Sequence, residues 1–68
     1  MNNLIILKTQ TIKEALINID LNEEGVICIV DDLNKVIGIA TDGDIRRKLL
    51  EGITIDQPIS KCMNSSFI

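Results

Sequence analysis

The stretch GIATDGDIRR, residues 38–47, decides the fold, because it joins the end of a strand to the start of a helix. Residues 36–40, VIGIA, are apolar and largely β-branched, which favours a strand. Thr41 and Asp44 then have the spacing of a capping box, in which each side chain satisfies a backbone amide of the other residue. The sequence therefore predicts a helix that begins at Thr41 and runs to about Glu51.

Gly38 stands inside this predicted strand. A glycine there is unfavourable unless another backbone or a ligand must come close. Either a ligand lies beside the strand at this position, or a helix packs closely on it.

The run VICIV, residues 26–30, precedes this strand and lies between Gly25 and Asp31. Five apolar residues in succession predict a central strand that is buried on both faces. Turn-forming residues separate this run from 36–40, so the two strands should form an antiparallel hairpin with a loop of about four residues.

An earlier capping box, Thr11 with Glu14, predicts a helix that begins at Thr11 and ends over 22–25. Apolar residues at the spacing of one buried helix face follow it: Ile12, Ala15, Leu16 and Ile19. A brief strand is expected over 4–7.

The C-terminal part carries weaker signals. Gly52 suits the end of the second helix. We expect an extended stretch after it, then a short helical turn near Pro58 and fraying beyond Asn64.

The composition indicates one small domain with an aliphatic core. The chain has 68 residues, of which 46% are hydrophobic, and Phe67 is its one aromatic residue. Folding at this length removes only about 60% of the surface of the unfolded chain, which leaves apolar surface that a partner would cover.

Several functions are disfavoured by what the chain lacks. Without His, imidazole catalysis and most zinc catalytic sites are excluded, so we expect no enzyme activity. The absence of Trp and Tyr and the net charge of -3 disfavour nucleic acid and anionic membranes as partners.

The N-terminus lacks a basic segment and its apolar run is too short for a signal peptide or a membrane span, so a cytoplasmic location is expected. Cys28 and Cys62 are interpreted as buried free thiols, with a disulfide or redox role as the alternative.

Asp42-Gly43-Asp44 also has the D-x-D form that holds a divalent metal in nucleotide-sugar transferases. Such an enzyme needs a far larger chain to enclose its substrates. Because the motif lies inside a capping box, helix capping is the preferred interpretation.

The order strand, helix, hairpin, helix, with the pattern G-h-h-T-x-x-D over 38–44, resembles the CBS domain, a family named after cystathionine β-synthase. The resemblance covers 4–63. It implies an α+β fold of β-α-β-β-α order, with a small sheet and two helices on one face. Residues 1–68 would then be a single CBS repeat, half of a two-repeat Bateman module.

CBS repeats usually pair, and the clefts of the pair bind adenosine nucleotides. The resemblance therefore implies a homodimer or a second CBS repeat of the same protein as partner, and AMP, ADP or ATP as regulatory ligand, with no cofactor required. The alternative is a purely structural dimerisation module without a ligand. More narrowly, 41–47 and 58–64 look like the first CBS repeat found ahead of sugar-phosphate nucleotidyltransferase domains and also in some sugar-phosphate isomerases. The N-terminal part of a sugar-1-phosphate nucleotidyltransferase is the expected context.

In the family, the Thr and the final Asp of this pattern contact the phosphate and the ribose hydroxyls, which here implies Thr41 and Asp44. A helix N-terminus suits a phosphate, although capping alone would also explain both residues.

For Gly38 the resemblance implies room for the purine ring beside the strand, with close packing of a helix as the alternative. Other positions are implied on the adenine side of the cleft, often through their backbone groups: Thr9, Thr11 and the segment Val26–Cys28, including Ile27 and Cys28. The family often has a proline near the position of Cys28, so this chain departs from the pattern there. Arg46 and Arg47 could reach phosphates, with solvated helix side chains as the alternative.

Overall fold

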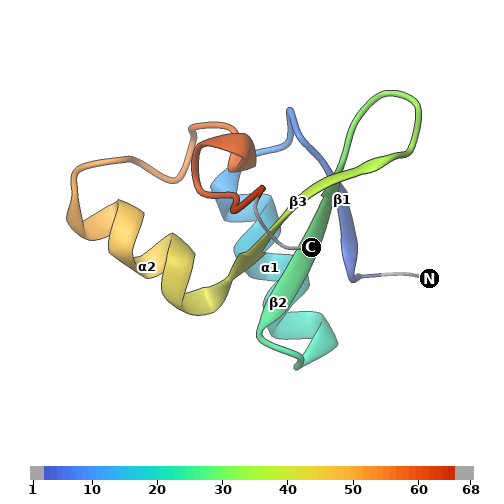
Figure 1. The fold of residues 1–68 in the computed structure, drawn as a ribbon. Helices are drawn as coiled ribbons and strands as arrows, with labels where there is room; N and C mark the ends of the chain where they lie inside the picture. The colour runs from blue at the N-terminus through green and yellow to red at the C-terminus, as the bar shows by residue number, and fades with distance from the viewer. Residues whose placement is uncertain (1–2, 66–68) are drawn as a thin grey trace.

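The computed structural model describes residues 3–65 and forms the predicted β-α-β-β-α unit (Figure 1). The elements in chain order are β1 Ile5–Leu7, α1 Ile12–Asn22, β2 Val26–Val30, β3 Val36–Thr41, α2 Asp42–Leu50 and a short 3₁₀ turn, η1, Ile59–Lys61. The α+β fold class expected from the sequence is confirmed.

The three strands lie in the order β1-β2-β3, so β2 is the central strand as predicted. β1 runs parallel to β2, and Leu7 pairs with Val30. β3 runs antiparallel to β2, and Thr41 pairs with Val26 at the other end of the sheet. The end of β1 and the start of α2 therefore lie at opposite ends of the sheet.

The hydrophobic core lies on one face of this sheet, under both helices. Alternate strand residues point to this face: Ile6, Ile27, Ile29 and Ala40. The helices meet them with Ile12, Ala15 and Ile19 of α1 and Ile45 of α2. Because these side chains form one continuous cluster, both helices cover the same face, as predicted.

The other face of the sheet is only partly covered. Val26 and Cys28 are half-buried, so the prediction that β2 is buried on both faces was wrong. On the neighbouring strands Ile5, Leu7 and Val36 are 40%, 41% and 47% exposed. The physical reason is that none of the helices within residues 3–65 packs on this side, because both cover the other face.

Both cysteines are free, but they differ in environment. Cys62 is buried in the core, and burial raises the pKa of its thiol. Cys28 is half-buried on the open sheet face, so the prediction of two buried thiols holds for Cys62 alone.

Both predicted capping boxes are present. At α1, the Thr11 hydroxyl accepts from the Glu14 amide at 3.1 Å, and the Thr11 amide donates to the Glu14 carboxylate at 2.9 Å. The helix ends at Glu23, whose φ of 58° is left-handed, just before Gly25 at φ 75°. Sequence and structure agree here because capping depends on neighbouring residues alone.

The C-terminal segment differs from the extended stretch that was predicted, because it turns over 55–56 and binds the start of α1. The amides of Ile12 and Lys13 donate to the carbonyls of Gln57 and Ile55, both at 2.9 Å. These bonds satisfy amides that a helix N-terminus leaves open. The 3₁₀ turn after Pro58 is confirmed, whereas the predicted fraying falls largely on residues 66–68, outside those described.

Within residues 3–65, neither helix is long and apolar enough to span a membrane.

Candidate functional site

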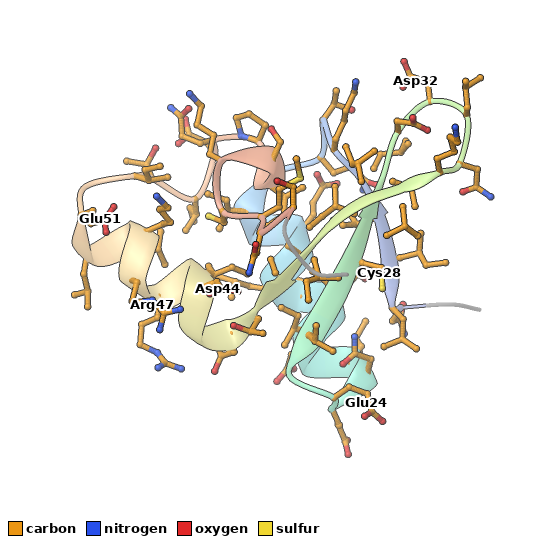
Figure 2. All side chains as sticks on the ribbon, in the orientation of Figure 1. Glu24, Cys28, Asp32, Asp44, Arg47 and Glu51 are labelled. Atoms are coloured by element: carbon orange, nitrogen blue, oxygen red, sulfur yellow. The ribbon has the colours of Figure 1, made fainter. Side chains whose placement is uncertain are left out.

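The N-terminus of α2 brings Thr41, Asp44 and Arg47 together. Figure 2 labels Asp44 and Arg47 on this helix. The Thr41 hydroxyl accepts from the Asp44 amide at 3.0 Å, and the Thr41 amide donates to Asp44 Oδ2 at 3.0 Å. Arg47 Nη2 donates to Asp44 Oδ1 at 2.5 Å. Each oxygen of the Asp44 carboxylate thus has a partner, and its orientation is fixed.

Asp44 is held in its charged form. The hydrogen bond from the Thr41 amide is the main cause that keeps the pKa of the Asp44 carboxyl below its ordinary value, and Arg47 acts in the same direction. Its side chain remains 25% exposed. Because a carboxylate oxygen accepts more than one hydrogen bond, Asp44 can still accept from hydroxyl groups of a ligand.

Arg46 belongs to a different ion pair. Its Nη2 lies 2.6 Å from Asp42 Oδ2, and both side chains are more than half exposed. The sequence offered Arg46 and Arg47 as phosphate contacts and Arg46 was the preferred candidate, whereas the structure joins only Arg47 to Asp44.

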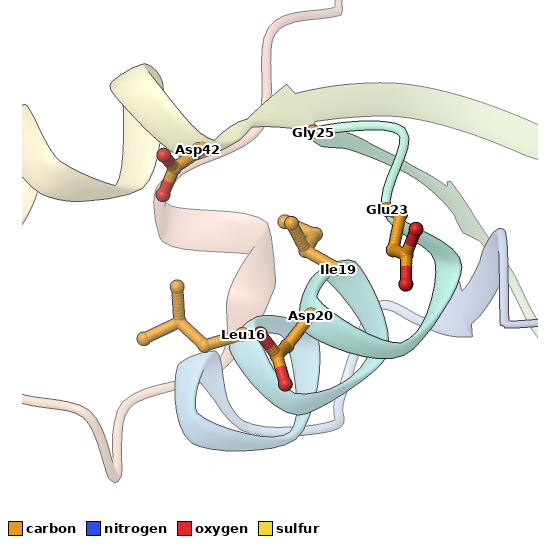
Figure 3. A pocket seen from close by; sticks show the side chains of 6 residues that line it. All are labelled: Leu16, Ile19, Asp20, Glu23, Gly25 and Asp42. Carbon is orange, nitrogen blue, oxygen red and sulfur yellow. The ribbon is translucent and has the colours of Figure 1, made fainter.

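Asp42 also lines a hollow of about 430 Å³ between α1, the turn before β2 and the start of α2 (Figure 3). Its apolar wall is formed by Leu16 and Ile19, and carboxylates of Asp20, Glu23 and Asp42 face it. Three acidic side chains repel a phosphate. A phosphate group would therefore bind more favourably on the Thr41 side of α2 than in this hollow.

Thr9 and Thr11 lie at the opposite end of the sheet from Thr41. They follow β1, which ends where Leu7 pairs with Val30, whereas Thr41 pairs with Val26. The intervening length of β2 is about 13 Å at the usual rise of a strand. Thr9 is exposed, and the hydroxyl of Thr11 is engaged in capping α1. One unit therefore does not gather all of the predicted site residues at one place.

Ile27 and Cys28 point to opposite faces of β2. The Ile27 side chain is fully buried under the helices, so it is closed to any ligand on the open face. Cys28 lies on the open face between Ile5 and Ile39. Of these two predicted residues, only Cys28 presents its side chain where a second layer would lie.

Gly38 is buried, and its close neighbour is neither a helix nor open space. A Cβ atom built on Gly38 would lie 2.8 Å from Met63 Sδ and 3.2 Å from the Asn64 carbonyl oxygen. The predicted close approach is confirmed, but Met63 and the Asn64 backbone make it, and not a helix, which was one of the two alternatives. A purine beside Gly38 would first have to displace Met63.

Among residues 3–65, no group of three or more Cys, Asp or Glu side chains is placed to hold a metal ion. Asp42 and Asp44 diverge to separate arginines. The sequence did not single out Arg47 from Arg46, although the i,i+3 spacing from Asp44 to Arg47 was a usable signal. No sequence signal pointed to Met63 as the neighbour of Gly38.

No protein-family model matches the chain. Among curated proteins, the arabinose 5-phosphate isomerase GutQ of Escherichia coli O6:H1 is 31% identical over 55 residues. That alignment covers 81% of this chain but only 17% of the isomerase. The chain thus spans a small part of its curated relatives.

Solved structures show the same fold. An uncharacterized conserved protein from Pyrococcus horikoshii superposes with a TM-score of 0.87 at 24% identity, covering 96% of this chain and 50% of the other. A CBS domain protein from Pyrobaculum aerophilum, complexed with AMP, superposes with a TM-score of 0.84 at 22% identity, covering 91% and 49%. In both, this chain corresponds to about half of the solved chain.

Proposed function

The chain has the fold of a CBS domain, and we propose that it is a regulatory module that binds an adenosine nucleotide in a cleft completed by a second CBS unit. In this proposal the chain itself catalyses no reaction. The nucleotide is AMP, ADP or ATP, and AMP is the first to test because a CBS protein of the same fold is complexed with it.

The observation that carries this proposal is the arrangement at the start of α2. Thr41 offers a hydroxyl at a helix N-terminus, where the dipole favours a phosphate. Asp44, held charged and still partly exposed, suits the ribose hydroxyls as acceptor. These are the two residues that the family pattern implies for the phosphate and the ribose.

A second unit would bring together the predicted site residues that lie at opposite ends of the sheet within one unit. The α2 end of the sheet carries Thr41 and Asp44, and the far end carries Thr9. If the open faces of two units pack together about a two-fold axis that runs between the sheets and across the strands near Cys28, the α2 end of one unit faces the far end of the other. The same packing covers the exposed side chains of Ile5 and Leu7. The partner is a second copy of the chain or a second repeat of a longer protein.

The regulated domain is proposed to act on a sugar phosphate. The support is the likeness to arabinose 5-phosphate isomerases, of which this chain matches a small part. The nucleotidyltransferase context expected from the sequence has no comparable support, so the isomerase context is preferred. A bound nucleotide would shift such a domain only by as much as its affinity differs between two arrangements of the paired units.

Calorimetric titration of the 68-residue chain with AMP, ATP and S-adenosylmethionine tests the ligand. We expect saturable heat with AMP or ATP and its loss in Asp44→Ala. Because Asp44 also caps α2, Asp44→Asn is the companion variant, and circular dichroism checks that both variants fold. Absence of saturable heat with all three compounds on the parent chain would refute nucleotide binding.

A purely structural dimerisation module is the second candidate. It is favoured by the apolar open face of the sheet and by the fact that Thr41 and Arg47 already engage both oxygens of Asp44. It predicts a dimer in sedimentation that no nucleotide alters.

A further inference from the structure

Arg47 reaches back to the first turn of α2 although its own backbone lies further along the helix. Besides its contact with Asp44, it lies over Gly43: a Cβ atom built on Gly43 would be 3.5 Å from Arg47 Nη1 and 3.8 Å from Thr41 Oγ1. The guanidinium and the Thr41 hydroxyl therefore lie on the same side of Gly43. Between the guanidinium and the hydroxyl, Gly43 contributes only a hydrogen atom where another residue would have a side chain.

A phosphate at the start of α2 would meet two negative side chains, so a nearby cation would favour its binding. Asp42 and Asp44 both lie in the first turn, and their charges oppose the attraction of the helix dipole for a phosphate. Arg46 offsets Asp42 beside the acidic hollow. Arg47 offsets Asp44, and a guanidinium has five N–H donors, so it can hold a carboxylate and a phosphate together.

We propose that Arg47 is the residue by which this module selects a phosphorylated ligand, an inference that rests on the nucleotide site proposed above. Its guanidinium binds a phosphate oxygen beside the Thr41 hydroxyl while it stays paired with Asp44, whose orientation the Thr41 amide also fixes. The module then distinguishes a nucleotide from a nucleoside through the phosphate alone. A nucleoside lacks the contact with Arg47 but still makes the contacts of its ribose and base.

The chain contains a matched control for this residue. Arg46 is the same residue type, is 64% exposed against 68% for Arg47, and makes an ion pair of the same kind with Asp42. Arg46→Gln and Arg47→Gln remove the same charge from neighbouring positions. Only Arg47 borders Gly43 and Asp44.

The experiment is calorimetric titration of the parent chain, Arg47→Gln and Arg46→Gln with AMP and with adenosine, at one ionic strength. A hydrogen bond to a charged group is worth enough that its loss weakens binding by about tenfold or more. We expect Arg47→Gln to weaken AMP by that factor and adenosine much less, and Arg46→Gln to keep the parent ratio of the two affinities. Arg47→Lys, which keeps the charge but not the fork of donors, should retain part of the preference for AMP.

Gly43→Ala tests the same space without changing charge. The added methyl makes only ordinary contacts, so the variant should fold at least as stably as the parent chain. It occupies the gap between Thr41 and Arg47, and AMP should bind more weakly while adenosine is little affected.

The outcomes separate the two proposals. If the parent chain binds AMP but Arg47→Gln keeps the parent AMP-to-adenosine ratio, or if both Gln variants lower it equally, the role of Arg47 is refuted and the nucleotide site stands. If the parent chain binds neither compound, the nucleotide site is refuted and this inference falls with it.

Discussion

Replacing Gly38 by Ala should destabilise the fold, because the new methyl meets the C-terminal segment. The added Cβ would lie 2.8 Å from Met63 Sδ and 3.2 Å from the carbonyl oxygen of Asn64. Met63 can swing aside, but the Asn64 backbone is held by two hydrogen bonds with Ile39, at 3.0 and 2.7 Å. Relief of the clash therefore strains or breaks this bridge.

The magnitude follows from opposing effects. Overpacking a core position costs about 1–3 kcal/mol, and each strained hydrogen bond adds up to about 1 kcal/mol. Alanine in a strand regains about 0.5–1 kcal/mol over glycine. We expect a net loss of about 1–2 kcal/mol, which lowers the Tm of so small a domain by roughly 5–15 °C.

Urea unfolding followed by far-ultraviolet circular dichroism, at one protein concentration, measures this loss. Gly43→Ala is the control within the same chain, since its methyl has room and should leave the stability unchanged or raise it. The double variant Gly38→Ala/Met63→Ala should lose less than the sum of the single variants, because removal of Met63 relieves part of the clash. A Gly38→Ala chain as stable as the parent, or strict additivity with Met63→Ala, would refute the reasoning.

Three further predictions concern capping, acidity and pairing. Thr11→Ala removes the cap of α1 and should lower the free energy of unfolding by about 1 kcal/mol in the same urea assay; an unchanged midpoint would contradict the assigned cap. The pKa of Asp44 is lowered in the folded chain, so the charged carboxylate stabilises the fold above its ordinary pKa of 3.8, and this stabilisation is lost as the pH falls below that value. The parent chain should therefore be more stable than Asp44→Asn at neutral pH, and this difference should shrink between about pH 5 and 2. Urea midpoints measured along a pH series would show it. Packed sheets lie about 10 Å apart, so a short bismaleimide should link two copies through Cys28 in the parent chain and in Cys62→Ser, but not in Cys28→Ser; crosslinking that persists in Cys28→Ser would place the pairing surface elsewhere.

The sequence by itself determined the local structure of this protein. Capping boxes at Thr11 and Thr41, the apolar run 26–30 and the turn chemistry around Asp31 each depend on residues a few positions apart, and each predicted its element correctly. The pattern over 38–44 likewise located Thr41 and Asp44 on one helix start, because a capping box is a geometric statement about the two residues in it.

Only the tertiary structure decided what meets what across the chain. Periodicity does not say how many layers cover a sheet, so the prediction that the strand over 26–30 is buried on both faces was wrong at Val26 and Cys28. Gly38 indicated a close approach, yet the approaching Met63 is far along the chain and reaches it through the bridge between Ile39 and Asn64. The ends of the sheet at which Thr9 and Thr41 lie follow from strand pairing, a long-range property that separates residues which the pattern had grouped in one site.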